Sequence, residues 1–214
     1  MPVPRAFYAG GVINGKIYVT AGEQDGGGGS RPPDLDIYDP TTGTWAVGTP
    51  DPNPRRSSAS TAWNGKLYII GGDTGGSPTN SVDVYDATTN TWGTETPLPV
   101  TINHATAQAL NGKIYVVGGL VNGTTLSTTT YVLDSVTHTW GVEAGLNQPR
   151  SQLGSAILNG IIYATGGAGG GNAHEAFITP VPPPTSKDQC KGNGWTNFNN
   201  PPFKNQGECI KFVH

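Results

Sequence analysis

Arginine and histidine side chains at matched positions are the first candidates for chemistry in this 214-residue chain. Arg5, Arg55 and Arg150 each lie nine residues before an Asn-Gly pair, whereas a fourth stretch of the same kind has Ile102 in that place. A guanidinium binds anionic groups and also hydrogen-bonds backbone carbonyls. The register therefore predicts either arginines that bind a ligand or, as the simpler alternative, structural arginines that hydrogen-bond carbonyls of the neighbouring repeat.

His104 is the other candidate ligand-binding side chain, and it stands where the matching stretches have Phe7, Ser57 and Gln152. A position that differs in every repeat is expected to face a channel or a loop end, although a lone histidine there is more often structural. The chain has no Gly-x-Ser-x-Gly or His-Glu-x-x-His motif, and the sequence shows no nucleophile–base pair. We therefore predict no catalytic residues, no metal ligands and no cofactor.

Four Asn-Gly pairs set the positions of these candidates, and they begin at residues 14, 64, 111 and 159. Asn-Gly favours a two-residue hairpin turn in which both residues have positive φ. The apolar, β-branched run that follows each pair is typical of a strand covered on both faces. A pair of glycines follows three of these runs and marks a tight turn or a close backbone approach, at Gly71, Gly72, Gly118, Gly119, Gly166 and Gly167.

A second set of landmarks keeps the same step of 47 to 50 residues, which indicates a radial or solenoid repeat. Tyr38 and Tyr85 each precede an aspartate that lies six residues before a tryptophan, and the tryptophans are Trp45, Trp92 and Trp140. Each repeat has room for four short strands and shows no helical periodicity. Because the tryptophans recur regularly, we expect them to pack between repeats rather than to stack on a sugar.

The order Gly-Gly, Tyr-Asp, Thr-x-Thr-Trp at this period resembles the kelch repeat. The resemblance implies an all-β fold of propeller blades, each with four antiparallel strands around a central channel. We expect blades at about 5–50, 55–99 and 102–146 and a partial fourth blade at 150–180, which form a propeller segment over residues 1–180. Because three complete blades and part of a fourth leave two blade faces open, self-association through those faces is a further expectation.

The family resemblance also implies a function. Kelch proteins mostly bind proteins or carbohydrates, and a few are enzymes. The copper radical oxidases need a cysteine–tyrosine crosslink, and residues 1–180 contain no cysteine. Sialic acid mutarotases bind an anionic sugar with charged residues, for which Arg5, Arg55 and Arg150 offer a comparison.

Charge and hydropathy limit the classes of partner that the sequence suggests. The formal net charge is −3 and no basic run is present, so nucleic acid and anionic membrane are poor partners. No stretch of 18 or more apolar residues is present, so we expect no transmembrane helix.

The C-terminal residues 187–214 form a separate module, which follows a proline-rich linker at 181–186. Their Asp-Gln-Cys-Lys, Gly-Trp and Phe-Lys-Asn-Gln-Gly-x-Cys pieces resemble a short element at the ends of secreted bacterial proteins. Cys190 and Cys209 are expected to form a disulfide, with two free cytosolic thiols as the alternative. The expected location is therefore extracellular or on the bacterial surface. No signal peptide is visible, so we expect an N-terminus truncated relative to a longer parent.

Three functions remain open from the sequence. The first is a non-catalytic secreted or surface-associated module that binds an unknown protein or glycan. The second is a carbohydrate-active enzyme of the epimerase or mutarotase kind. The third is a structural domain that displays the C-terminal module.

Overall fold

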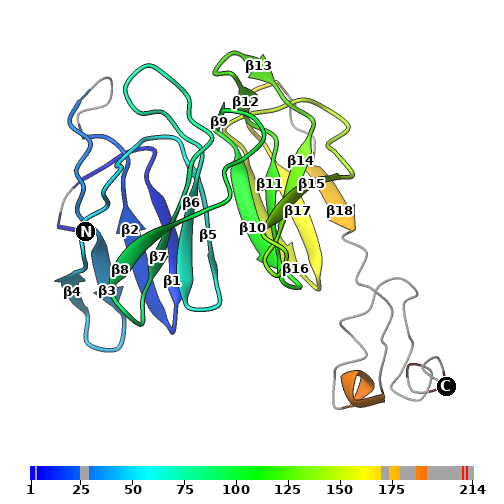
Figure 1. Cartoon of the computed structure of the whole chain (residues 1–214), viewed down its shortest axis with the longest axis horizontal. Coiled ribbons are helices and arrows are strands. Elements are labelled where there is room, and N and C mark those ends of the chain that lie inside the picture. Colours follow the sequence, from blue (N-terminus) through cyan, green and yellow to red (C-terminus); the bar gives the residue numbers. More distant parts are fainter. Residues whose placement is uncertain are drawn as a thin grey trace.

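The computed structural model describes residues 1–2, 4–24, 29–169, 174–178, 187–191, 209 and 211. They form an all-β structure of successive antiparallel sheets (Figure 1). Sheet one contains β1 (Ala9–Ile13), β2 (Lys16–Thr20), β3 (Asp36–Asp39) and β4 (Thr44–Val47), and sheet two contains β5 (Ala59–Trp63), β6 (Lys66–Ile70), β7 (Val82–Asp86) and β8 (Thr91–Glu95). Sheet three contains β10 (Thr106–Leu110), β11 (Lys113–Val117), β14 (Thr130–Asp134) and β15 (Thr139–Glu143), and sheet four contains β16 (Gly154–Leu158), β17 (Ile161–Thr165) and β18 (His174–Ile178).

Three complete four-stranded sheets and a three-stranded fourth confirm the expected fold class. Each sheet is a meander whose first two strands meet at an Asn-Gly pair. In sheet two, Trp63 pairs with Lys66 across Asn64 and Gly65, whose φ angles are 48° and 74°. Both values lie in the left-handed region that this two-residue hairpin requires.

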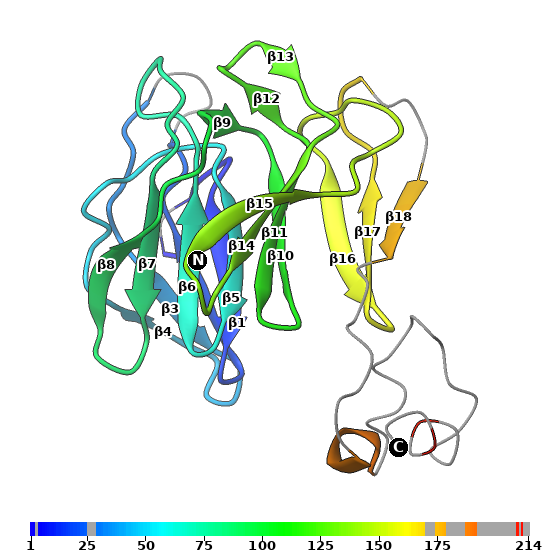
Figure 2. The ribbon, with the colours of Figure 1, turned by 45° about the vertical axis from the view of Figure 1, so that its right-hand side comes forward.

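The sheets stand side by side in chain order, with their first strands innermost (Figure 2). β1 packs on β5, β5 on β10, and β10 on β16. No strand of sheet one packs on sheet four to this extent, so the described sheets form an open arc.

The core lies in the junctions between sheets rather than within one sheet. Between sheets one and two, Tyr18 and Ile13 pack with Leu67 and Tyr85. Corresponding clusters join sheet two to sheet three and sheet three to sheet four. The second strands of sheets two and three are therefore covered on both faces, as their nearly continuous apolar sequence predicts.

A small extra sheet, which the sequence analysis did not predict, lies beyond one end of the strands. It consists of β9 (Ile102–Asn103), β12 (Leu120–Val121) and β13 (Thr125–Leu126), and the last two are joined at another Asn-Gly pair. In Figure 1 these strands lie at the top with the loops that join the second and third strands of the sheets. This is also the end at which each innermost strand begins.

The described part of the C-terminal module is a 3₁₀ helix, η1 (Lys187–Cys190), together with a disulfide between Cys190 and Cys209. Their Cα atoms are 5.7 Å apart, and the expected pairing is confirmed. The proline-rich linker at 181–186 lies outside the described residues. Among the residues that are described, no helix has the length and apolar character needed to cross a membrane.

Candidate functional site

Four residues at one repeated position share an unusual backbone conformation. Phe7, Ser57, His104 and Gln152 have φ angles of 52°, 56°, 55° and 56°. Each lies two residues before the innermost strand of its sheet. The left-handed region costs a non-glycine residue roughly 1–2 kcal/mol, so the surrounding structure must hold these residues in place.

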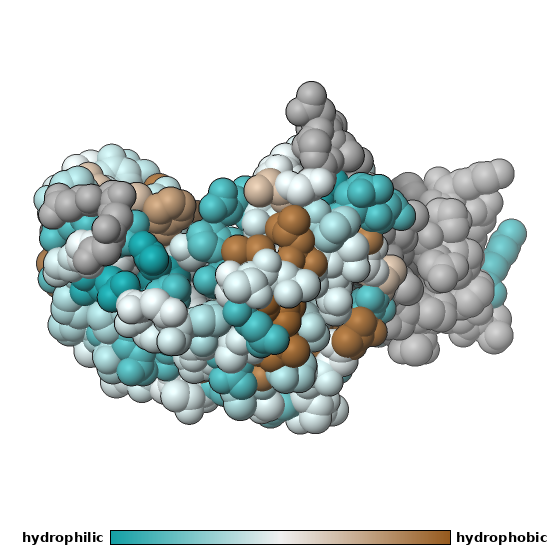
Figure 3. Space-filling model, turned by 90° about the horizontal axis from the view of Figure 1, so that it is seen from above, coloured by the Kyte–Doolittle hydropathy of each residue, from teal (hydrophilic) through white to brown (hydrophobic). Residues whose placement is uncertain are grey.

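Hydrogen bonds between sheets hold them. The amide of Ser57 donates to the carbonyl of Phe7 at 2.9 Å, that of His104 to Ser57 at 2.8 Å, and that of Gln152 to His104 at 2.8 Å. The chain of bonds advances by one sheet at each step around the inner edge of the arc. These four residues lie where the innermost strands begin, at the same end as the loops that join the second and third strands. We call them the channel-mouth quartet. Figure 3 looks onto this end, where apolar side chains lie among a mostly polar surface.

The quartet borders a hollow of about 270 Å³. It is lined by Phe7, Tyr8, Ser57, Ser58, His104, Ala105 and Gln152. Phe7 and Tyr8 are 49% and 54% exposed. Exposed aromatic rings beside uncharged hydrogen-bonding groups are typical of a ligand-binding surface.

His104 is the residue in this hollow whose side chain can both donate and accept hydrogen bonds through its ring nitrogens. Burial, aided by the positive charge of Arg56 and opposed by Asp73, lowers the pKa of its imidazole below 6.5, so the neutral form prevails at pH 7. Its Nε2 lies 3.1 Å from the Ser57 hydroxyl, and its ring stands edge-on to Phe7 with centroids 6.1 Å apart. Within the described part of the chain, His104 Nδ1 is buried without a hydrogen-bond partner.

The Ser57–His104 pair went unnoticed in the sequence because 47 residues separate the two. Tyr8 and Ser58 were missed as well, although each directly follows a quartet residue. The sequence does contain a signal for them. A position that varies between repeats indicates a functional surface, and residues directly after it are expected to lie on the same surface.

Ion pairs beside the hollow neutralise one another. Arg56 contacts Glu23 at 2.7 Å, and its Nε lies 3.9 Å from Asp73. Burial alone would raise the pKa of Asp73, but amide hydrogen bonds from Gly76 and Gly75, with Arg56 nearby, outweigh burial and lower it. Two carboxylates therefore lie beside the Arg56 guanidinium, and the described residues that line the hollow include no lysine or arginine.

The arginine candidates lie elsewhere, inside the sheets. Arg5, Arg55 and Arg150 are 9%, 1% and 0% exposed. The guanidinium of Arg5 bonds to Asp36 at 2.9 Å, and that of Arg55 pairs with Asp83. In the described structure these three guanidinium groups are buried and bonded within the protein, which favours the structural alternative for them.

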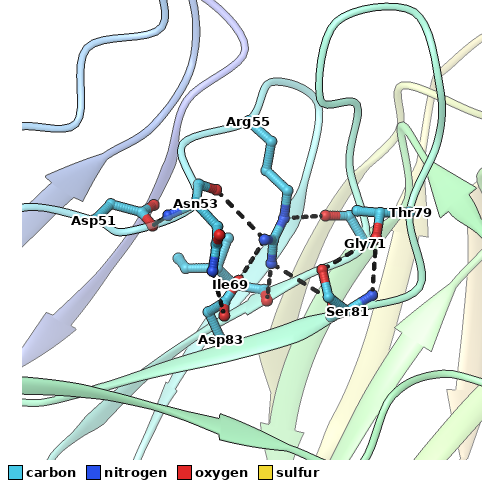
Figure 4. A network of polar contacts seen from close by, with 8 residues as sticks. All are labelled: Asp51, Asn53, Arg55, Ile69, Gly71, Thr79, Ser81 and Asp83. Carbon is cyan, nitrogen blue, oxygen red and sulfur yellow. Dashed lines mark hydrogen bonds and ion pairs between the residues drawn. The ribbon is translucent and has the colours of Figure 1, made fainter.

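Figure 4 shows that Arg55 serves its own sheet. Its Nε donates to the Gly71 carbonyl at 2.6 Å, and a terminal nitrogen donates to the Ile69 carbonyl at 2.9 Å. Arg5 and Arg150 likewise bond to the carbonyls of Ala21 and Gly166 in their own repeats. The expected bonds to the neighbouring repeat are thus replaced by bonds within one repeat, because the side chain folds back onto the end of the second strand.

Sheet three replaces this ion pair with an apolar pair. Ile102 stands at the arginine position, and Tyr131, opposite Val116, stands where Asp83 lies opposite Ile69. Ile102 and Tyr131 are 0% and 9% exposed and belong to one cluster. Both partners differ together, so no buried charge is left unpaired in that sheet.

The tryptophan landmarks lie at the junctions between sheets. Trp92 Nε1 donates to the Thr49 carbonyl at 2.9 Å, and Trp140 Nε1 donates to the Thr96 carbonyl at 2.8 Å. Each bond links a sheet to the one before it. Trp45, in the first sheet, packs on Tyr38 with ring centroids 5.0 Å apart, as Trp92 packs on Tyr85 at 5.3 Å.

The glycine landmarks bring neighbouring backbones together. Gly71 and Gly72 have φ angles of 61° and 101°, and the amide of Gly72 donates to the Ile102 carbonyl at 2.8 Å. A Cβ on Gly71 would collide with that carbonyl. The paired glycines, which also include Gly118, Gly119, Gly166 and Gly167, all have positive φ.

Known proteins share this architecture. Residues 1–167 match the family model described as the KLHDC2/KLHL20/DRC7 Kelch-repeats domain. Over 72 residues the chain is 36% identical to F-box/kelch-repeat protein At1g67480 of Arabidopsis thaliana, an alignment that covers 34% of this chain and 19% of that protein. The structure of YjhT superposes with a TM-score of 0.67 at 18% identity, over 77% of this chain and 59% of the YjhT chain.

These similarities differ in what they establish. The likeness to YjhT shows the fold alone, and the chain spans only part of the length of both relatives. The family model, in contrast, covers most of the chain and every complete sheet. The chain belongs to the kelch-repeat family.

Proposed function

We propose that this protein is a protein-binding module and that the channel-mouth quartet with the adjoining hollow receives a short uncharged peptide segment. The observation that carries this proposal is the contrast between backbone and side chain at the quartet. The four backbones are equivalent, whereas the side chains are an aromatic ring, a hydroxyl, an imidazole and an amide. A rigid frame that presents different side chains at equivalent points is suited to recognition.

The chemistry of the hollow favours a neutral ligand. Phe7 and Tyr8 offer exposed rings for an apolar side chain. Ser57, His104 and Gln152 offer hydroxyl, imidazole and amide groups for peptide N–H and C=O groups. Membership of the kelch family and the resemblance to an F-box/kelch-repeat protein support protein binding by analogy.

A glycan is the second candidate ligand. Aromatic rings next to hydroxyl and amide groups also suit the apolar face and the hydroxyls of a sugar. The Cys190–Cys209 disulfide supports an extracellular or cell-surface setting, in which glycans are abundant.

We further propose that the module binds its ligand without catalysing a reaction on it. The Ser57 hydroxyl lies within hydrogen-bond distance of the His104 imidazole, as in a nucleophilic triad, but His104 Nδ1 meets no carboxylate among the described residues. An imidazole without an orienting partner is a weak general base.

Selection from a displayed random-peptide library, run in parallel with a glycan array, tests the proposal. Ligands that bind the wild-type chain are then measured against Phe7→Ala and His104→Ala. Loss of one hydrogen bond or one ring contact costs about 1–2 kcal/mol, which is roughly a 5- to 30-fold loss of affinity.

His138→Ala is the matched control, because His138 has a similar φ of 56° but lies in an exposed turn of sheet three. Ligands that bind both channel-mouth variants as well as wild type would contradict the proposed site. Enrichment on the glycan array alone would replace the peptide with a sugar.

A further inference from the structure

Each end of the arc exposes a second-strand residue whose counterparts are buried at every interior junction. On the second strand, Ile17 of sheet one is equivalent to Leu67, Ile114 and Ile162. Those three residues are 0%, 0% and 1% exposed because each packs against the preceding sheet, whereas Ile17 is 40% exposed. Val12, which lies beside Ile17 across the first hairpin, is 61% exposed, and its counterpart Ile157 at the third junction is 37% exposed. We call Val12 and Ile17 the leading face.

The opposite end shows the complementary exposure. Tyr163 of sheet four is equivalent to Tyr18, Tyr68 and Tyr115, which are 7%, 7% and 4% exposed because each packs against the following sheet. Tyr163 itself is 37% exposed. Leu158 is 60% exposed, whereas its counterpart Ile13 in sheet one is 4% exposed. We call Leu158 and Tyr163 the trailing face.

The interior junctions show what such faces pack against. At the first junction, the trailing residues Ile13 and Tyr18 share one apolar cluster with Leu67 of sheet two, and the Tyr18 ring lies tilted against Tyr85 with ring centroids 5.9 Å apart. The leading face of sheet one and the trailing face of sheet four are therefore the two halves of one junction.

We propose that, in solution, the trailing face of one molecule packs against the leading face of a second copy of this chain. The contact repeats the interior junction, so it also continues the hydrogen-bond chain of the channel mouth. The amide of Phe7 in the second copy takes the place next to the carbonyl of Gln152 in the first. A site that ends at Gln152 in one molecule then becomes a longer inner rim shared by two.

The contact is expected to be weaker than an interior junction. At the interior junctions between the complete sheets, a tryptophan at the start of the fourth strand donates a hydrogen bond to the loop after the fourth strand of the preceding sheet. Trp92 and Trp140 make these bonds. The described residues of sheet four end at β18 and include no fourth-strand loop to accept such a hydrogen bond. A reversible, concentration-dependent assembly follows. The two faces differ, so the contact is head-to-tail and either closes on itself as a dimer or continues as a chain.

Sedimentation velocity of the full chain over a wide concentration range tests the proposal. Wild type is expected to shift from monomer toward a larger species as concentration rises. Ile17→Glu and Tyr163→Lys are each expected to reduce the assembled fraction at least tenfold, because each places a charge in one half of the junction. Val136→Glu is the control, since Val136 is 83% exposed in a turn of sheet three away from both faces.

Mixing the two face variants makes the test specific to a head-to-tail contact. An Ile17→Glu molecule keeps an intact trailing face and a Tyr163→Lys molecule an intact leading face, so an equal mixture is expected to regain pairs. Circular dichroism verifies that both variants fold, and Val12→Glu replaces Ile17→Glu if that variant does not. Wild type that stays monomeric throughout, or a mixture of folded variants that does not pair, would overturn the proposal.

Discussion

The buried pair of Arg55 and Asp83 yields the sharpest prediction about stability. Their side chains are 1% and 3% exposed. Arg55→Ile removes the guanidinium and leaves the Asp83 carboxylate buried with only Asn53 Nδ2, at 3.2 Å, as a hydrogen-bond donor among the contacts of Figure 4. Loss of one partner of a buried ion pair costs about 3–5 kcal/mol, so the free energy of unfolding should fall by that amount.

Sheet three supplies the compensating change. The double variant Arg55→Ile/Asp83→Tyr introduces the residues that sheet three uses at these positions, Ile102 and Tyr131. Because no unpaired charge remains, the double variant is expected to recover about 2–4 kcal/mol of the loss, with repacking as the residual cost.

Urea unfolding followed by tryptophan fluorescence measures both values, with Asp83→Tyr alone completing the cycle. An unchanged dependence on urea concentration verifies that the same surface unfolds in each variant. Two results would refute this account, in which Arg55 and Asp83 can be replaced together but not one at a time. One is a loss of less than about 1 kcal/mol for Arg55→Ile, and the other is a double variant that is no more stable than Arg55→Ile.

The remaining predictions concern the junctions, the turns and the tail. Trp92→Phe removes the bond to Thr49 but keeps an aromatic ring, so thermal unfolding should show a loss of about 1 kcal/mol. The side-chain hydrogen bond from Thr41, helped by Lys16, lowers the pKa of Asp39 to about 2, so its stabilising contribution is present above pH 3.8 and is lost as pH falls toward 2. Asp39→Asn should therefore flatten the acid limb of an unfolding profile, and an unchanged limb would count against this account. Thiol titration of the unreduced chain should find no free cysteine, as its two cysteines are paired, and reduction should release both.

Local patterns in the sequence predicted much of the fold. Asn64 and Gly65 specify their hairpin by backbone conformation alone, and the same pair recurs in each repeat. The period then predicted the order of the four large sheets without knowledge of any long-range contact. The aspartates before the tryptophan turns also act locally: Asp86 accepts the amide hydrogen bond of Thr88 at 2.9 Å.

The candidate site depended on contacts that no local pattern encodes. Ser57 and His104 meet only because neighbouring sheets bring their backbones together. The arginines were ambiguous for the same reason, since their sequence register is equally compatible with a channel or with the interior of a sheet. The structural role of Arg55 depends on its pairing with Asp83, which lies 28 residues later in the sequence. In the extra sheet, the hairpin of β12 and β13 is local, whereas β9 pairs with β12 across 17 or more residues.

The most direct test of the proposed binding site is a nuclear magnetic resonance titration that follows the histidine ring protons while a selected ligand is added. The proposal predicts that the His104 signals shift with the ligand concentration because the ligand enters the hollow beside its ring. The signals of His138, in its exposed turn, should stay in place. Shifts confined to His138, or an unaltered His104 in the presence of a saturating ligand, would contradict binding at the channel mouth.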